Sequence, residues 1–499
     1  MKKHLRVLSL ILVVSMLTCV MFSCAAENVQ ESETLPAMSR DTDENRDYVD
    51  DLPELNFEGA DVSIICSTRE QVKDEFFSES LSTNALSSAV YTRNQMVNAR
   101  LNVNLNVITD SGSDHNSINE KVSMAIKSGE DAYDIVSAPT YKASHYVIEG
   151  CYRNLYNLEY LNLDKLYWSQ GFNDVFSFWN DKQYLATGTA VISIYRFMYA
   201  TIYNKDMFYS VGEDDLFDVV NSGDWTIEYQ TRISRSFFAD TGNPETTTYG
   251  MATGYSISVD PYWVSLQVPI LQKNANNSFE TTVFNDSAMA KLTNAVDLVL
   301  KLYAEPSVKV WDESQDRFSI SDFKPITTFY SQQAAMTTTT MYAIENNMDQ
   351  LALLNYGIVP MPKYDIDQEK YYSALQDQVS ALGISGSVTD NRLPMMGAVL
   401  ECMASESQNT IVETYYGKLL SYRYLQDYNS QQMLKLIYEG SGINMASAYS
   451  GLILSTGYIT TMRKLIESQM NTTVSTVAGF SNELYRNIEE LNDNFSKVK

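Results

Sequence analysis

Apolar residues change their spacing several times along the first part of the chain, and each change marks a new element. The run "ADVSIIC" (60–66) is short and mostly apolar, which is typical of a buried strand in a parallel sheet. Residues 83–100 place apolar side chains near the spacing of a helix face. In "LNVNLNVI" (101–108), apolar residues then alternate with asparagines, as a strand requires. The pattern therefore predicts a strand, a helix and a second strand.

A further helix and strand follow directly. In "SINEKVSMAIKSG" (117–129), Ile118, Val122 and Ile126 share one face of a helix. The apolar segment "YDIVSAP", which starts at Tyr133, predicts the next strand. The resulting order, strand-helix-strand-helix-strand, predicts an α/β fold with an open parallel sheet.

The loops that follow the first and third strands are candidate binding positions. In open parallel sheets, ligands bind beyond the carboxyl ends of the strands. We therefore expect the site to include residues of these two loops, namely Ser67, Thr68, Pro139, Thr140 and Tyr141.

Four consecutive threonines stand in the later segment "AAMTTTTMY" (334–342). Small and β-branched residues suit a buried strand, which we predict over 334–337. The chain is then expected to turn into a helix that starts near Tyr342. Threonine hydroxyls at this turn can cap the free amides of the helix or face a ligand. The candidates for the site here are Thr339, Thr340 and Tyr342.

Length and composition narrow the class of protein. A chain of 499 residues is too long for one compact core, so we expect two lobes. Its 44% hydrophobic residues can fill these cores, which excludes global disorder. The formal charge of -26 repels nucleic acid, and no stripe of basic residues overrides that repulsion. Binding to nucleic acid is therefore excluded.

The N-terminus has the pattern of an export signal, with basic residues before a mostly apolar run. The segment "MFSC" places the small residue Ser23 before a cysteine, which is typical of lipoproteins. We predict a signal peptide over residues 1–23 and a lipid anchor on Cys24, since acyl chains hold a protein on a membrane. A weaker match at Cys19 and an uncleaved signal anchor are the alternatives.

Residues 24–55 are acidic, rich in serine and threonine, and poor in large apolar side chains. Such a segment cannot bury enough surface to order itself, so we predict a disordered tether between the anchor and the folded body. No later segment approaches the roughly 20 apolar residues of a membrane-spanning helix. The body is therefore expected to lie outside the membrane.

The sequence offers little for catalysis. It has three histidines and none of the zinc-protease, serine-hydrolase or phosphate-loop motifs, so we predict no catalytic residue, metal site or cofactor. Pairs of carboxylates such as Asp214 and Asp215 leave open a secreted glycoside hydrolase that uses an acidic pair. The cysteines of the body are widely spaced, and we interpret them as buried apolar residues with at most one disulfide. They are Cys66, Cys151 and Cys402.

Several segments carry a resemblance to a known family when they are taken in order. They include "SGEDAYDIVSAPTY" (128–141), "YATIYNKDMF" (199–208), "FYSQQAAM" (329–336) and "YGIVPMPKYDIDQEKYYS" (356–373). Together with the lipoprotein signal, "DWTIEYQ" and "YGM", they resemble the sugar-binding solute-binding proteins of bacterial ABC importers, a group that includes maltose-binding protein. The segments cover nearly everything after the tether.

The resemblance implies two α/β lobes that are joined by hinge crossovers and enclose a ligand in the cleft between them. The first crossover would lie just before "ATIYNKD" and the second between Pro362 and Asp377. With approximate borders, lobe one would contain 56–194 and 323–365, and lobe two would contain 195–322 and 366–499.

The resemblance also implies binding positions. The loop at Pro139, Thr140 and Tyr141 would line the cleft, in agreement with the sheet argument. Aromatic rings stack on the apolar face of a pyranose, while polar groups bond its hydroxyls. The further candidates are Tyr195 and Arg196 near the first crossover, Tyr262 and Trp263 in "VDPYW", and Tyr342 at the position of a stacking tryptophan.

This resemblance implies a non-catalytic substrate-binding protein, anchored by lipid on the outer face of the bacterial cytoplasmic membrane. It would act as a monomer, capture an oligosaccharide by lobe closure and deliver it to the transmembrane subunits of an ABC permease. Gln332 replaces the family's usual glycine and Tyr342 its usual tryptophan, so the identity of the ligand stays open. The alternatives are the glycoside hydrolase and a receptor for peptides or other polar solutes. In such a receptor, arginine and carboxylate side chains would line the cleft.

Overall fold

The computed structural model describes residues 48–112, 115–156, 158–312, 324–420 and 428–498. The predicted signal peptide (1–23), Cys24 and the tether up to residue 47 lie outside the described residues. The end of the predicted tether, 48–55, is described, and its buried Asp50 forms an ion pair with Arg100, so the prediction of disorder is wrong for these residues. By its internal contacts the chain divides into Met1–Ser39 and Arg40–Lys499, and the second unit holds all the described residues. Within them, no helix is long and apolar enough to cross a membrane.

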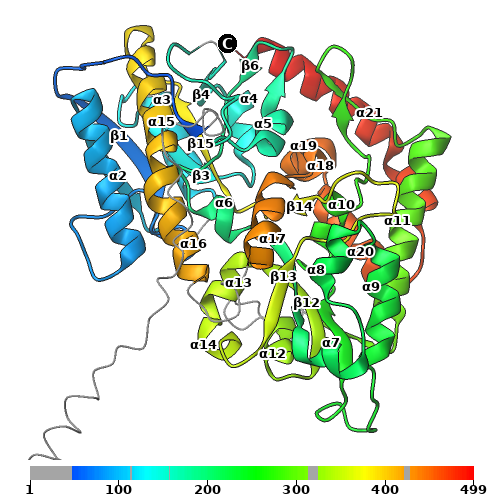
Figure 1. The fold of residues 1–499 in the computed structure, drawn as a ribbon. Helices are drawn as coiled ribbons and strands as arrows, with labels where there is room; N and C mark the ends of the chain where they lie inside the picture. The colour runs from blue at the N-terminus through cyan, green and yellow to red at the C-terminus, as the bar shows by residue number, and fades with distance from the viewer. Residues whose placement is uncertain (1–47, 113–114, 157, 313–323, 421–427, 499) are drawn as a thin grey trace, which may run out of the picture. The chain divides into compact units, whose positions relative to one another are not determined.

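Five strands form the first sheet, in the order β2-β1-β3-β15-β4 (Figure 1). β1 is parallel to β2 and β3, while β15 is antiparallel to β3 and to β4. The helices α2 and α3 connect the first three strands, which confirms the predicted order strand-helix-strand-helix-strand. The bounds are β1 (Ala60–Ser67), α2 (Ala85–Leu101), β2 (Val103–Asp110), α3 (Ser117–Ser128), β3 (Ile135–Pro139), β4 (Tyr152–Arg153) and β15 (Ser380–Ser385).

Helix α2 shows why this part of the chain follows its local pattern. The side chain of Asn84 caps the helix by accepting hydrogen bonds from the amides of Leu86 and Ser87, at 2.9 and 3.2 Å. At the other end, Asn102 adopts the left-handed conformation, with φ of 48°, and stops the helix. Strand β2 can therefore begin at the next residue.

The second sheet also has five strands, in the order β11-β8-β12-β7-β13. β8 is parallel to β11 and β12, while β7 is antiparallel to β12 and β13. Strand β7 lies in the segment "YATIYNKDMF" (199–208), and all its residues are buried. The bounds are β7 (Tyr199–Asn204), β8 (Tyr249–Gly254), β11 (Val308–Trp311), β12 (Ala334–Thr340) and β13 (Tyr356–Val359).

The return of the chain to the first sheet differs from the prediction. We expected residues 323–365 to belong to the first lobe, but β12 and β13 both pair with β7 in the second sheet. The chain returns only at β15, which pairs with β3. The assignment of 323–365 to lobe one is therefore wrong, as is that of 366–499 as a whole to lobe two.

Two segments carry the chain between the sheets, and they lie side by side. The first leads through α6 (Ser193–Arg196) into β7, and the second precedes β15. The amide of Gln376 donates to the carbonyl of Phe197 at 3.1 Å, which joins the two segments. The buried carboxylate of Glu75 accepts from the amide of Ser193 at 3.0 Å and from the hydroxyl of Ser380 at 2.7 Å. Both crossovers are thus fixed to the loop that follows β1.

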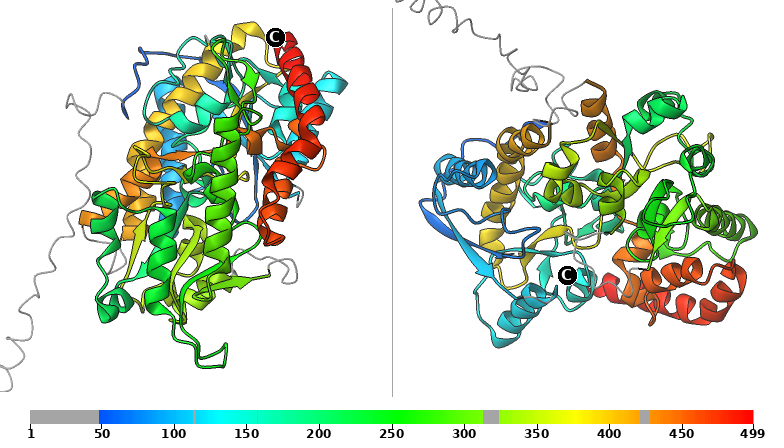
Figure 2. Two further views of the ribbon diagram at one scale, coloured as in Figure 1. Left: turned by 90° about the vertical axis from the view of Figure 1, so that its right-hand side faces the viewer. Right: turned by 90° about the horizontal axis from the view of Figure 1, so that it is seen from below.

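The C-terminal part of the chain packs on both sheets. Helix α15 (Leu393–Ser407) lies against α2, whereas α20 (Tyr458–Glu467) and α21 (Thr473–Lys497) lie against α11 (Asp286–Ala304). Figure 2 shows the red α21 alongside the green α11. The remaining helices of six or more residues are α4 (Ala143–Ile148), α5 (Gln170–Phe176), α7 (Lys205–Val211), α8 (Leu216–Asn221), α9 (Ile227–Ser234), α10 (Asp260–Ser265), α12 (Lys324–Tyr330), α13 (Met341–Asn346), α16 (Glu413–Leu420) and α17 (Tyr428–Glu439).

The short elements connect these helices and strands. Two small antiparallel pairs are β5 (Ser177–Phe178) with β6 (Lys182–Gln183) and β9 (Gln272–Lys273) with β10 (Phe279–Glu280). A parallel pair joins β14 (Ser373–Ala374) to β16 (Ser441–Gly442). The short helices are α14 (Met348–Leu351), α18 (Met445–Ala448) and α19 (Ser450–Ile453).

Candidate functional site

The loop after β3 meets both crossover segments at one place. The amide of Tyr141 donates to the carbonyl of Asp377 at 2.8 Å, and that of Gln376 donates to Phe197 at 3.1 Å. The carboxyl end of β3 therefore lies at the joint between the two sheets. This is the edge at which ligands of open α/β sheets bind.

A small polar cavity lies at this joint. Its volume is about 40 Å³, which is room for a few water molecules and well below the 300 Å³ or so of the smallest ligand pockets. A sugar ring can enter only if the walls move apart. The lining residues come from five separate segments and include Tyr199, Asp260, Gln376, Asp377, Asn444 and Arg463.

Asp260 and Arg463 form an ion pair in the wall of this cavity. The Nε of Arg463 donates to Oδ1 of Asp260 at 2.9 Å, and its Nη2 contacts the other carboxylate oxygen. Burial raises the pKa of Asp260 to about 6, although Arg463 favours the charged form. The pair binds the start of α10 to α20, which is far away in the sequence.

Asp377 is the second carboxylate of the cavity, and it is less well paired. Among the described residues, its side chain accepts one hydrogen bond, from Nε2 of Gln378 at 3.3 Å. Burial raises the pKa of Asp377, and Gln378 and Arg463 offset part of that rise. Its carboxylate therefore keeps hydrogen-bonding capacity that faces the cavity.

Basic and aromatic groups approach Asp377 from the side of the first sheet. The Nη1 of Arg69 donates to Oε1 of Gln378 at 3.1 Å and contacts Nδ1 of His115. The ring of His115 meets that of Tyr141 edge to face, with centroids 6.4 Å apart. Tyr141 is 37% exposed, so part of its ring is open to a ligand.

Comparison of the sequence with protein-family models and with curated proteins finds no match. Solved structures do match. They include the GacH receptor of Streptomyces glaucescens (14% identity, TM-score 0.52), which covers 86% of this chain and 99% of its own. An ABC substrate-binding protein from Listeria monocytogenes, solved with cycloalternan, has 15% identity, a TM-score of 0.51, and coverage of 88% of this chain and 99% of its own. A cyclo/maltodextrin-binding protein, solved with maltotetraose, has 10% identity, a TM-score of 0.54, and coverage of 87% and 97%.

The chain has the two-lobe fold of these sugar-binding proteins. The first sheet with its helices is the first lobe, and the second sheet with its helices is the second lobe. In these terms, the polar cavity lies where the crossovers join the two lobes. This position agrees with the cleft expected from the sequence.

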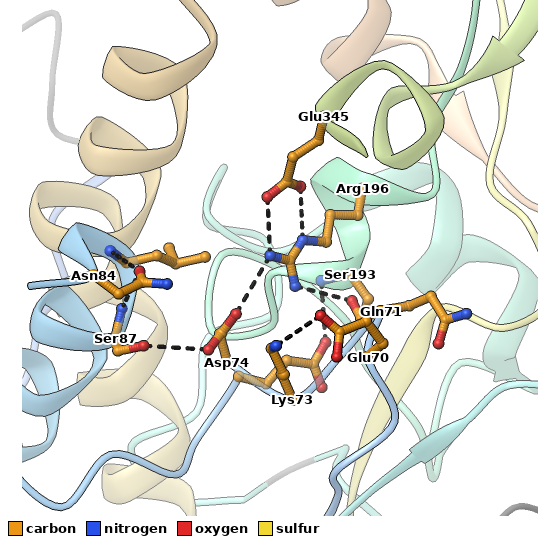
Figure 3. Close-up of polar contacts among 11 residues, drawn as sticks. Glu70, Gln71, Lys73, Asp74, Asn84, Ser87, Ser193, Arg196 and Glu345 are labelled. Carbon is orange, nitrogen blue, oxygen red and sulfur yellow. Dashed lines mark hydrogen bonds and ion pairs between the residues drawn. The ribbon is translucent and has the colours of Figure 1, made fainter. Parts of the chain in front are cut away.

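Arg196 bridges the two lobes beside the cavity, and Figure 3 shows its contacts. Its Nε and Nη2 donate to the carboxylate of Glu345 on α13 of the second lobe, at 2.9 and 3.1 Å. Its Nη1 donates to the carbonyl of Gln71 at 3.0 Å, and Asp74 lies 3.5 Å from Nη2. These partners use most of the N–H donors of the guanidinium, so the main role of Arg196 in the structure is to connect the lobes.

The threonine run and Tyr342 lie close to this bridge. Thr340 caps α13 by accepting a hydrogen bond from the amide of Ala343 at 3.3 Å, which confirms one of the predicted roles. Thr339 is buried in β12. The ring of Tyr342 lies 5.8 Å from the guanidinium carbon of Arg196 and is 5% exposed. Ligand contact by Thr339, Thr340 and Tyr342 stays a prediction.

Three other predicted site residues are buried in packing. The ring of Tyr195 is 1% exposed and stacks on Tyr438, with centroids 5.2 Å apart. Tyr262 is fully buried and donates from its hydroxyl to Gln230 at 3.1 Å, and Trp263 is 2% exposed. These side chains have no open ring face for a sugar. Helical spacing explains why Tyr262 and Trp263 are buried. In α10, Asp260 and Val264 face the cavity, whereas Tyr262 and Trp263 face inward.

The residues of the predicted loops have different surroundings. Ser67 and Thr140 are buried, and the hydroxyl of Thr140 donates to the carbonyl of Val379 at 2.8 Å. Pro139 is buried at the end of β3, while Thr68 is exposed. Of these residues, Tyr141 lies at the joint with free surface, while the exposed Thr68 is bonded to Asp110 at the end of β2.

The sequence analysis missed the charged residues of the cavity. Asp260 could have been found, since it opens the helix that contains the chosen Tyr262. Arg463 could not, because it reaches Asp260 across 203 positions of sequence. Asp377 and Gln376 lie in the predicted second crossover but were not singled out.

Two larger hollows among the described residues lie away from the joint between the lobes. A hollow of about 790 Å³ lies between β4 and the end of α21, and one of about 410 Å³ lies between α9 and α11. The first hollow lies beside the ends of β4 and β15, at the edge of the first sheet opposite to the carboxyl end of β3, and the second is lined by α9, α11 and the residues that follow α11. Within the described part of the chain, no group of three or more metal-ligating side chains is assembled. The acidic pair of the cavity, Asp260 and Asp377, has one member held by Arg463.

Proposed function

We propose that the protein is the substrate-binding component of an ABC importer and captures a neutral oligosaccharide between its lobes. It is non-catalytic and monomeric, is anchored through Cys24 on the outer face of the cytoplasmic membrane, and delivers the sugar to a permease. The observation that carries the proposal is the position of the polar cavity. It lies at the strand ends and at the joint of the lobes, in a fold shared with receptors solved with sugars.

The side chains around the joint support a sugar ligand. Tyr141 offers a partly exposed ring, and Asp377, Gln376 and Arg69 offer polar atoms. A pyranose needs both kinds of group, because its faces are apolar and its edge carries hydroxyls. Because the cavity holds only a few waters, the lobes must separate before a ring can enter.

A receptor for a charged or peptide-like solute is the second candidate. The ion pair of Asp260 with Arg463 in the cavity wall favours it, since such a pair can recognise ionic groups. A secreted glycoside hydrolase has less support, because Arg463 already binds one carboxylate of the acidic pair in the cavity.

A thermal-shift screen separates these candidates. The purified protein is melted with neutral oligosaccharides, short peptides and free amino acids. A ligand at about 100 times its dissociation constant adds roughly 2.7 kcal/mol to the free energy of unfolding, which raises the melting temperature. We expect a neutral oligosaccharide to give the largest shift. A shift with peptides or amino acids alone would support the second candidate instead.

A further inference from the structure

The joint between the lobes contains hydrogen-bonding atoms that lack partners among the described residues. The Oε1 of Gln376 is buried and has no hydrogen-bond partner among the described residues. The carboxylate of Asp377, the next residue, accepts a single long hydrogen bond of 3.3 Å from Gln378. Both side chains line the polar cavity. Unsatisfied buried acceptors are costly unless a bound molecule supplies donors.

The charged groups around these two acceptors indicate whether the hydrogen-bond donors of a ligand are neutral or cationic. Asp260 is already paired with Arg463, and Asp377 has Arg463, His115 and Arg69 within electrostatic reach. Arg463 and Arg69 offset the negative charge of the two carboxylates, so the joint does not need a cationic ligand to compensate them. Neutral hydroxyl groups can donate to Asp377 and Gln376 without disturbing that balance.

The position of these acceptors links ligand binding to the lobes. The backbone of Gln376 is bonded to Phe197 at the entry to the second lobe, and that of Asp377 is bonded to Tyr141 in the first. A ligand held by both side chains is therefore attached to the segment that connects the lobes. The hydrogen bonds of the ligand therefore stabilise the arrangement of the lobes in which both acceptors face the ligand.

We propose that Gln376 and Asp377 are specificity-determining residues that accept hydrogen bonds from adjacent hydroxyl groups of a neutral sugar ring. This inference rests on the proposed function and deepens it, because it assigns the class of group that the crossover recognises. In its charged form, the side chain of Asp377 takes the stronger bond, since hydrogen bonds to a charged acceptor are the stronger ones. Burial raises the pKa of Asp377, while Arg463 and Arg69 oppose that rise and so favour the charged carboxylate.

Calorimetric titration of matched variants tests the proposal. The probes are maltotetraose and a neutral glycan panel, with acarbose as an oligosaccharide that carries an amine. Asp377→Asn is nearly isosteric, and we expect it to weaken binding of the neutral sugar about tenfold or more. Gln376→Ala should weaken it by a smaller factor. Asp367→Asn, an exposed change in the same return segment, is the control and should leave the affinity unchanged.

The outcomes are distinct. If a neutral sugar binds and Asp377→Asn and Gln376→Ala both leave its affinity unchanged, this inference is overturned and the proposed function stands. If acarbose binds more tightly than every neutral sugar and loses most in Asp377→Asn, the recognised group is an amine and the inference is also overturned. If no oligosaccharide binds the protein, the proposed function fails and the inference fails with it. Circular dichroism melting of each variant confirms that it is folded.

Discussion

Arg196 and Glu345 form a two-point ion pair across the joint between the lobes, with donor-acceptor distances of 2.9 and 3.1 Å. Both side chains are almost fully buried, at 5% and 7% exposure. The same guanidinium donates to Gln71 of the first lobe at 3.0 Å. The pair therefore ties α13 to the loop after β1, and any separation of the lobes here must break one of these contacts.

Removing this cation should destabilise the protein strongly. Arg196→Met removes a buried ionic partner of the Glu345 carboxylate, and we expect the free energy of unfolding to fall by about 3 kcal/mol. The matched control is Arg235→Met, which removes an ion pair with Glu305 whose arginine is 60% exposed. Exposed pairs contribute at most about 1 kcal/mol. Urea unfolding measures both variants, and equal small losses would contradict the role given to Arg196.

The carboxylate of Glu401 should make stability depend on pH. It is buried and accepts from Nε1 of Trp168 at 3.1 Å and from the amide of Asn162 at 3.2 Å. Burial raises its pKa from 4.5 to about 7, so the folded protein holds this proton more tightly than the unfolded chain does. The free energy of unfolding should therefore fall as pH rises from 4.5 to 7, by about 3 kcal/mol from this group.

The variant Glu401→Gln removes that titration and keeps an oxygen for Trp168 and Asn162. Its stability should change less than that of the unmodified protein over the same pH range, as measured by urea unfolding at several pH values. Glu489→Gln on the exposed side of α21 is the control and should retain the full pH dependence. Parallel pH profiles for all three proteins would show that Glu401 does not titrate as argued.

The cysteines of the body should be inert thiols. Cys66, Cys151 and Cys402 are free and buried, which confirms the interpretation from the sequence. Burial raises the pKa of Cys66 and of Cys402 to about 12, so little reactive thiolate exists at neutral pH. In protein with Cys19 and Cys24 replaced by serine, DTNB should label no thiol in the folded state and three in denaturant. A count below three in denaturant would reveal a disulfide.

The cap of α13 offers a local test of the threonine run. Thr340→Ala removes the hydroxyl that accepts from Ala343 and should lower the free energy of unfolding by about 1 kcal/mol. Thr340→Ser keeps that oxygen and should recover most of the loss. If the serine variant is no more stable than the alanine variant in urea unfolding, the methyl group and not the cap is what matters.

The fold of the first lobe could be predicted because its signals are local. In α2, β2 and α3 the apolar residues follow the period of the element, β1 and β3 are short apolar runs, and caps such as Asn84 fix the ends. Strand β12 lacks such a signal. All seven of its residues are buried, so no alternation indicates which sheet it joins. Its pairing with β7 is set by contacts more than a hundred positions apart, and this is why the return of the chain was misplaced.

Some residues of the polar cavity follow from the sequence and others do not. The loop at Tyr141 follows from the sheet rule, and the structure brings it to the joint. Tyr262 and Trp263 are buried in packing, and their helix presents Asp260 to the cavity, so ligand contact by these two rings stays a prediction. Arg463 arrives from a C-terminal helix whose packing no local pattern encodes.

Calorimetric titration of the purified protein with neutral maltodextrins, followed by chromatography of the recovered sugar, tests the central claim most directly. The proposed function predicts saturable binding of one oligosaccharide per chain, with the sugar recovered intact. Recovery of shortened sugars, or the absence of binding by every neutral oligosaccharide tested, would contradict it.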